Sequence, residues 1–217
     1  MPAFECLYLS LMAVISLYGV HRFWLIWGAK GDAPAFRPAL GDGDHFPCVL
    51  VQLPVYNETD VVHRLIDAAV ALDWPTECLE IQVLDDSTDG SSDEIARTVG
   101  RHRRTGASIV HLRRSDRVGY KAGALQAGLE QSGAEYVAIF DADFAPPPGF
   151  LRAMLPSLIQ DPKVGMAQAR WGFTNATTNR LTEIQAALLH GHFDIEHRAR
   201  GRAGRFFNFN GTAGVWR

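Results

Sequence analysis

The stretch YVAIFDADFAPPPGF, residues 136–150, decides the fold class. Its first five residues, Tyr136 to Phe140, are largely apolar and run directly into two carboxylates, Asp141 and Asp143, and then into three prolines. A short apolar run bounded by turn residues indicates a buried strand. The pattern therefore raises the question of why a buried strand should end on two negative charges one residue apart.

The rest of the sequence alternates between short apolar runs and segments with helical spacing. This alternation predicts an α/β fold with a mainly parallel sheet and helices on both faces. In such sheets ligands bind outside the carboxyl ends of the strands. Two acidic pairs, Asp85 with Asp86 and Asp141 with Asp143, should therefore lie along one rim. The predicted strands cover 48–56, 79–86, 107–112, 136–140 and 164–171, and the predicted helices cover 60–72, 92–100, 121–131, 149–160 and 177–200.

The N-terminal segment is long and apolar. Between Phe4 and Trp27 the only formal charges are Glu5 and Arg22, and as a helix this segment would extend about 36 Å, enough to span a bilayer core. A signal peptide is the alternative, but no basic residue precedes the apolar run. Because Arg22 lies near the end of the apolar segment, Lys30 and Arg37 follow it and no Lys or Arg precedes it, the positive-inside rule predicts that the remainder is cytoplasmic.

Composition and patterning suggest a division into an anchor (1–28), a Gly- and Pro-rich linker (29–47) and an α/β domain (48–217). Of the 217 residues 47% are hydrophobic and 21% charged, which is typical of a globular protein. The net charge of −3 implies no general attraction to nucleic acid. The three cysteines have no metal-binding or redox spacing and are expected to be free thiols. We expect the three N-glycosylation motifs, at Asn57, Asn175 and Asn210, to be unmodified.

The D-x-D triplet of Asp141 and Asp143 can be explained by a metal ion. Close carboxylates repel each other unless a proton or a cation lies between them. Mg²⁺ or Mn²⁺ would relieve this repulsion, and Mg²⁺ usually also takes phosphate oxygens from a substrate. The alternative is an acidic turn or cap with no function, which is common for such a triplet.

Two further segments allow both a structural and a functional interpretation. The segment VLDDSTDGSSDE (83–94) suits a turn followed by a helix N-terminus, and it also suits hydrogen bonding of Asp86 to a ribose or base. The segment RVGYKAGAL (117–125) lacks the spacing of a P-loop, but Lys121 at a helix N-terminus can bind a diphosphate. A solvated surface lysine is the alternative.

The ordered set PVYNE, DDSTD, GYKAGAL and DAD resembles the family 2 glycosyltransferases of GT-A fold. The later segments AQARWGFTN (167–175) and FNFNGTAGVWR (207–217) resemble the membrane-bound branch that includes cellulose-synthase-like and mannan-synthase-like enzymes. The resemblance extends from about Pro47 to Arg217. It implies a metal-dependent, inverting transfer of a sugar from a UDP- or GDP-linked donor to a glycan or lipid acceptor, at the cytoplasmic face of a membrane.

The resemblance also implies roles for individual positions. It implies that donor nucleotide is bound by Pro54, Tyr56, Glu58, Asp86, Lys121 and Asp141, with the ring of Tyr56 offering a stacking face for the base. It implies that the divalent metal, Mg²⁺ or Mn²⁺, is held by Asp141 and Asp143. The acceptor site would include Asn210, Gly211 and Thr212.

The sequence departs from the family pattern after the acceptor loop. The family's general base lies in a T-E-D-like motif beyond that loop, followed by a Q-x-x-R-W motif, and this chain ends at Arg217 without either. We therefore expect a sequence cut short at its C-terminus, and no catalytic base is assigned. Two alternatives stay open: a sugar-nucleotide-binding module without turnover, and a nucleotidyltransferase, which would need an early Gly-rich loop that LPVYNE lacks.

Two further clusters of polar residues each allow a functional and a structural interpretation. The segment HGHFDIEH (190–197) is rich in possible metal ligands, but in an α-helix only His190 and His197 would share a face, which favours a packing helix. Basic residues cluster at 97–117 and 198–205, and such runs are mostly solvated surfaces.

Overall fold

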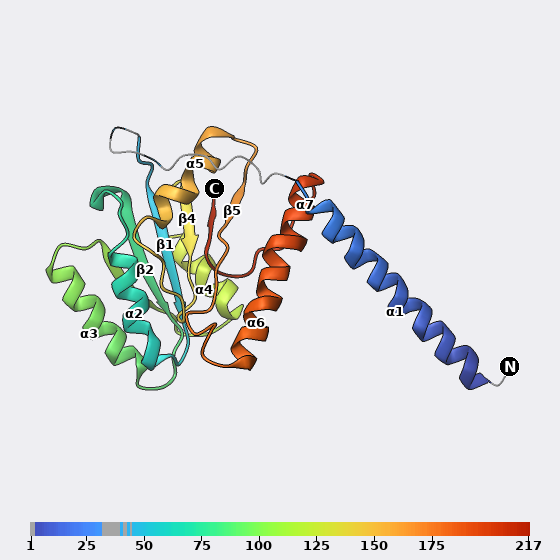
Figure 1. The fold of residues 1–217 in the computed structure, drawn as a ribbon. Helices are drawn as coiled ribbons and strands as arrows, with labels where there is room; N and C mark the ends of the chain where they lie inside the picture. The colour runs from blue at the N-terminus through green and yellow to red at the C-terminus, as the bar shows by residue number, and fades with distance from the viewer. Residues whose placement is uncertain (1–2, 32–39, 41–42, 44) are drawn as a thin grey trace. The chain divides into compact units, whose positions relative to one another are not determined.

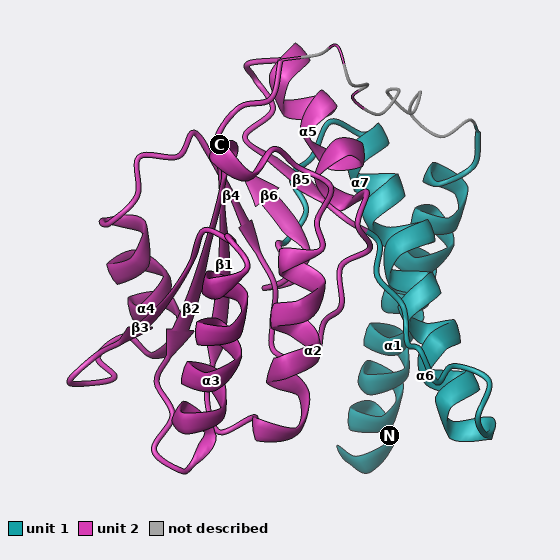
Figure 2. Ribbon diagram, turned by 90° about the vertical axis from the view of Figure 1, so that its left-hand side faces the viewer, with its two compact units in different colours: residues 1–36, 170–208 teal, residues 37–169, 209–217 magenta. Residues whose placement is uncertain are grey.

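The computed structural model describes residues 3–31, 40, 43 and 45–217, so most of the predicted linker lies outside the described residues. The chain divides into two compact units (Figure 2). One comprises residues 1–36 and 170–208, and the other comprises residues 37–169 and 209–217. Residues 170–208, which the sequence grouped with the α/β domain, thus cluster with the N-terminal segment.

The larger unit contains a six-stranded sheet of order β3-β2-β1-β4-β6-β5, of which β1, β2, β4 and β5 are labelled in Figure 1. Strands β1 to β4 are parallel, and β6 pairs antiparallel with both β4 and β5. The predicted mainly parallel sheet is therefore confirmed. The strands are β1 (Val49–Val55), β2 (Leu79–Asp85), β3 (Ile109–Arg113), β4 (Tyr136–Ile139), β5 (Met166–Gln168) and β6 (Gly214–Trp216).

The strand order determines on which face of the sheet each helix lies. The chain moves outward from β1 to β2 to β3 and then returns past them to β4. Because parallel crossovers are right-handed, this reversal places the helix before β4 on the opposite face from the two helices before it. Figure 2 shows this arrangement, with α4 across the strands from α2 and α3. The helices of this unit are α2 (Thr59–Val70), η1 (Thr76–Cys78), α3 (Ser91–Arg104), α4 (Tyr120–Leu129) and α5 (Phe150–Gln160).

The far edge of the sheet differs from the prediction. A strand was expected over 164–171, but only Met166–Gln168 is extended, and it pairs with β6 alone. Strand β6 was not predicted. It lies between β4 and β5, where its central residue Val215 is fully buried.

Two glutamines connect the sheet to α4. Gln52 and Gln82 are almost completely buried, and Gln52 Nε2 donates to Gln82 Oε1 at 3.2 Å. Their amides also donate to main-chain carbonyls of α4, Gln52 to Leu125 (3.0 Å) and Gln82 to Gly128 (3.0 Å). A Cβ atom on Gly128 would lie 2.5 Å from Gln82 Oε1 and 2.7 Å from Gln52 Nε2. Glycine at position 128 therefore permits α4 to approach the polar pair closely.

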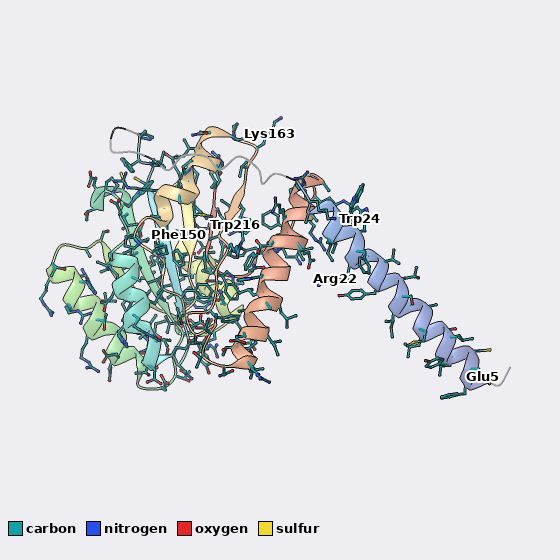
Figure 3. All side chains as sticks on the ribbon, in the orientation of Figure 1. Glu5, Arg22, Trp24, Phe150, Lys163 and Trp216 are labelled. Atoms are coloured by element: carbon teal, nitrogen blue, oxygen red, sulfur yellow. The ribbon has the colours of Figure 1, made fainter. Side chains whose placement is uncertain are left out.

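The smaller unit contains α1 (Ala3–Gly28), which is long and apolar enough to cross a membrane by length and composition. Glu5 lies at its N-terminal end and Trp24 near its C-terminal end (Figure 3). Leu25 and Ala29 pack against Ala199, with Ile195 beside them. The C-terminal end of this helical segment is thus tied to a second helical segment of the same unit.

This second segment confirms the predicted long helix in outline but not in geometry. It consists of α6 (Arg180–His190), a π-helical part η2 (Gly191–His197) and α7 (Arg198–Arg202). It begins at Arg180 rather than at residue 177 because the Asn179 side chain caps it, accepting hydrogen bonds from the main-chain nitrogens of Leu181 and Thr182.

The π-helical part corrects the expected histidine pairing. A π-helix brings residues i and i+5 together, so His192 and His197 face each other with ring centroids 4.2 Å apart. The pairing of His190 with His197, expected for an α-helix, was wrong. Among the described residues no group of three or more His, Cys, Asp and Glu side chains is arranged to hold a metal ion.

We predict that Gly128→Ala destabilises the larger unit by about 1–2 kcal/mol, because overpacking against two buried amides outweighs the gain in helix propensity. Gly100→Ala is the matched control in α3, where the added Cβ would meet only Arg104 Nη1 at 3.7 Å. The control should stabilise by up to about 1 kcal/mol. Unfolding midpoints of the full chain in detergent measure both effects, and equal shifts would contradict the proposed packing constraint.

Candidate functional site

The candidate site lies where three neighbouring strands end. Val55 of β1 is paired in register with Asp85 of β2, and Gln52 of β1 with Ile139 of β4. Tyr56, Asp86 and Asp141 therefore leave the sheet at the same edge. The expectation that the acidic pairs share one rim is met by this register.

A cavity of about 270 Å³ opens at this edge. It is formed by the ends of β1, β2 and β4 and by the start of α4. It includes all six side chains that the sequence suggested for a donor nucleotide. The lining residues are Pro54, Val55, Tyr56, Glu58, Leu84, Asp86, Arg117, Lys121, Ala124, Asp141 and Ala142.

Asp86 is bound by an arginine that the sequence did not single out. Arg114 donates through Nε to Asp86 Oδ1 (2.9 Å) and through Nη2 to Asp86 Oδ2 (2.5 Å). The hydrogen bond with Asp86 raises the pKa of Arg114. Arg114 belongs to the basic run 97–117, which was interpreted as a solvated surface. That interpretation fits Arg97, which is 73% exposed, but not Arg114, which is 18% exposed.

Tyr56, the predicted stacking residue, has a cationic neighbour. The guanidinium carbon of Arg117 lies 3.4 Å from the centroid of the Tyr56 ring. Arg117 Nε also lies 3.9 Å from Asp86 Oδ2. The aromatic face and the carboxylate are thus both in contact with the loop that precedes α4.

Lys121 connects three parts of the site. It lies in the first turn of α4, and its Nζ donates to Asp141 Oδ1 and to the main-chain oxygen of Gly211 at 2.7 Å. The Lys121 side chain is 38% exposed and lines the cavity. Lys121 therefore balances the charge of Asp141 and contacts the predicted acceptor loop.

The carboxylates at this rim are close enough to affect one another. Partial burial raises the pKa of Glu58, and the negative charges of Asp143 and Asp141 raise it further. Among the described residues Asp143 has no ion pair. Two carboxylates in a region of concentrated negative charge are a suitable donor set for a hard divalent cation, so Asp141 and Asp143 fit Mg²⁺ or Mn²⁺.

The predicted acceptor residues lie beside the cavity rather than in its lining. Thr212 is buried, and its hydroxyl accepts a hydrogen bond from the main-chain nitrogen of Asp141 at 2.9 Å. The main-chain nitrogen of Asn210 donates to Gln168 Oε1 at 3.2 Å. Gly211 has φ 84°, a conformation that favours glycine. The loop thus positions Asp141 directly through Thr212.

Asp85 differs from its neighbour, although the sequence treated both as one acidic cluster. It is 1% exposed, its Oδ2 lies 2.8 Å from His111 Nε2, and its Oδ1 accepts from the Ser87 nitrogen at 2.8 Å. Burial by itself would raise the pKa of Asp85, but the hydrogen bonds from His111 and Ser87 hold it well below its usual range. Asp85 therefore supports the loop after β2 and does not face the cavity.

The amino-acid sequence is similar to that of known glycosyltransferases. Residues 51–216 match the family described as "Glycosyl transferase family 2". Glucomannan 4-beta-mannosyltransferase 2 of Arabidopsis thaliana is 43% identical over 201 residues, which cover 89% of this chain and 38% of the relative. Glucomannan 4-beta-mannosyltransferase 7 of the same plant is 47% identical over 176 residues, 79% of this chain and 32% of the relative. The chain therefore spans about a third of the length of these relatives.

A solved structure confirms the predicted GT-A fold. Mannosyltransferase PcManGT from Pyrobaculum calidifontis, in complex with GDP-Man and Mn²⁺, superimposes with a TM-score of 0.70 and covers 98% of this chain and 55% of its own. The two sequences are 23% identical, so this likeness concerns the fold.

We predict that the stabilising effect of Asp85 weakens in acid. Its pKa is lower in the folded chain than in the unfolded one, so the unfolded chain takes up the proton first as the pH falls. At pH 7, Asp85→Asn should cost about 2 kcal/mol, because His111 loses a charged acceptor. The difference from the unsubstituted chain should shrink as the pH falls below about 4.

Thermal unfolding of the full chain in detergent between pH 7 and pH 3 tests this prediction. Glu135→Gln, an exposed carboxylate at the start of β4, serves as the control and should follow the unsubstituted chain at every pH. A difference for Asp85→Asn that stays constant down to pH 3 would contradict the assigned role.

Proposed function

This chain belongs to glycosyl transferase family 2, and from that premise we propose that it binds a nucleotide-diphospho-sugar and takes part in transferring the sugar to a glycan acceptor. The relatives' names, glucomannan 4-beta-mannosyltransferase, favour a mannosyl donor and a polysaccharide acceptor. Polysaccharide is therefore preferred over a lipid acceptor.

One observation carries the proposal. Six side chains suggested for donor binding, from three strand ends and one helix start, line a single cavity. They divide by chemistry: the ring of Tyr56 suits a base, the carboxylate of Asp86 suits N–H or hydroxyl donors of a base or ribose, and Lys121 suits a diphosphate. A convergence of this kind supports binding of a whole nucleotide rather than of an isolated sugar.

The diphosphate end of the site would stabilise the leaving group. Lys121 lies in the first turn of α4, where the ammonium charge and the helix dipole act in the same direction on an anion. Asp141 and Asp143 would hold Mg²⁺ or Mn²⁺, which when bound neutralises charge that develops on the leaving diphosphate. Lys121 would add a second positive charge that stabilises the leaving diphosphate.

The acceptor end of the proposed site is next to the loop that follows residue 208. The loop of Asn210, Gly211 and Thr212 is proposed to line the acceptor site, and the Thr212 hydroxyl fixes the main chain at Asp141. An inverting transfer needs a carboxylate that takes the proton of the acceptor hydroxyl. No residue of this chain is assigned that role.

We further propose that α1 anchors the protein in a membrane with the larger unit in the cytoplasm. The length and apolarity of α1 support the anchor. Lys30 and Arg37 follow α1 closely in the sequence, which supports the orientation.

We predict that UDP or GDP binds in a manner that depends on Mg²⁺ or Mn²⁺, and that Asp143→Asn weakens this binding by about ten- to a hundredfold. Losses of that size occur even when a group that merely supports a metal ligand is removed. Calorimetric titration of the full chain in detergent, with and without the metal ion, measures the effect.

Glu135→Gln is the matched control, because it removes a charge from the opposite end of β4. It should bind as the unsubstituted chain does. Equal binding by Asp143→Asn would refute the metal assignment, and nucleotide binding without any sugar transfer from GDP-mannose or UDP-glucose would favour a binding module.

The membrane proposal is tested separately. A reporter fused after Arg217 should be active only in the cytoplasm, and the sequons at Asn57, Asn175 and Asn210 should carry no glycan. A reporter that is active only on the other side of the membrane would overturn the orientation without affecting the proposed chemistry.

A further inference from the structure

The guanidinium of Arg117 lies against the aromatic ring proposed to stack on the donor base. Its central carbon is 3.4 Å from the centroid of the Tyr56 ring and 5.5 Å from that of Tyr120. Both Arg117 and Tyr56 line the cavity. A planar cation at that distance covers one face of the Tyr56 ring and occupies the layer that a base stacked on that face would fill.

Charge balance does not require Arg117 in this position. The carboxylate nearest to it, Asp86, already receives two hydrogen bonds from Arg114. Arg117 Nε lies 3.9 Å from Asp86 Oδ2, beyond hydrogen-bond distance, and among the described residues this buried nitrogen has no hydrogen-bond partner. A buried donor without a partner is costly, and the side chain is therefore held by its contact with the ring and by charge attraction to Asp86, without a hydrogen bond from Nε.

The main chain around Arg117 is held by other groups. Arg114 donates to the carbonyl oxygens of Val118 (2.9 Å) and Tyr120 (3.0 Å), and the Tyr120 nitrogen donates to the Arg117 oxygen at 2.8 Å. Gly119 and Tyr120 both have positive φ, 74° and 48°. The loop can therefore keep its shape while the Arg117 side chain changes rotamer.

We propose that Arg117 occupies the base position on Tyr56 in the unliganded protein and must swing away before the donor base can stack. This inference rests on the proposed function, because it concerns the same cavity. Arg117 is then a gate on nucleotide binding and takes no part in the transfer reaction. The affinity for a nucleotide is reduced by the fraction of molecules in which the ring is covered.

The size of this reduction follows from the contact that is lost. A guanidinium on an aromatic ring at a partly exposed position contributes about a twofold to fivefold preference for the covered state. Removing the planar group should tighten nucleotide binding by about the same factor. Pyrophosphate has no base, so its binding should not respond to the ring being uncovered.

Arg117→Lys is the decisive variant, because lysine keeps the positive charge but lacks the planar group that stacks. We expect it to bind UDP and GDP about two- to fivefold more tightly, with pyrophosphate binding unchanged. In Arg117→Ala the loss of the positive charge should weaken pyrophosphate binding. The ratio of UDP affinity to pyrophosphate affinity should still rise. Arg103→Ala, an exposed arginine of α3 outside the cavity, should change neither affinity.

Calorimetric titrations of the full chain in detergent with metal ion present give these affinities, and unfolding midpoints verify that each variant is folded. If Arg117→Lys and Arg117→Ala lower the UDP-to-pyrophosphate ratio, Arg117 is itself a base-binding residue and the gate is refuted. An unchanged ratio refutes it as well. If the unsubstituted chain binds neither UDP nor GDP, the proposed function fails, whatever the variants do.

Discussion

Repulsion among carboxylates at the ends of parallel strands is the constraint on which this site depends. Asp85 and Asp86 at the end of β2 and Asp141 after β4 lie at one edge of the sheet, on either side of β1. Each has a cationic or hydrogen-bonding partner: His111, Arg114 and Lys121 respectively. All three partners come from one segment of eleven residues, 111–121, that joins β3 to α4. The acidic rim is therefore tolerated because one connection supplies the groups that balance it, and any rearrangement of this connection would alter all three carboxylates together.

This dependence explains which parts of the site could be predicted from sequence. The acids were found because each follows a continuous apolar run, and such runs mark strand ends without further information. Their partners were missed because Arg114 lies in a loop with no periodic signal and within a basic run that is mostly exposed. Its pairing with Asp86 arises from the register of β2 against β3, in which Asp85 lies opposite Arg113. Register is a property of the folded sheet, so a single sequence does not reveal it.

The same reasoning applies to the fold. The four parallel strands, their helices and the apolar helix α1 each have enough residues for a periodic or continuous pattern to be recognised. Strand β6 has three residues, too few for an alternation, and it is defined by its insertion between β4 and β5. The π-helical part of the 180–202 segment changes the pairing of side chains from i and i+4 to i and i+5 over only seven residues, too few for a periodic pattern of their own. Only the structure reveals that His192, and not His190, faces His197.

The pairing of Asp86 with Arg114 also bears on how the cavity would select a nucleotide under the proposed function. A carboxylate accepts hydrogen bonds from N–H groups, and uracil and guanine both carry such groups. Asp86 alone therefore does not distinguish a UDP-linked from a GDP-linked donor. Space is the remaining criterion, because a purine needs more of it than a pyrimidine. The cavity of about 270 Å³ is just below the roughly 300–1,000 Å³ of typical ligand pockets, and Arg117 forms part of its wall. The volume that becomes free when the Arg117 side chain moves therefore affects whether the cavity accepts a purine or only a pyrimidine.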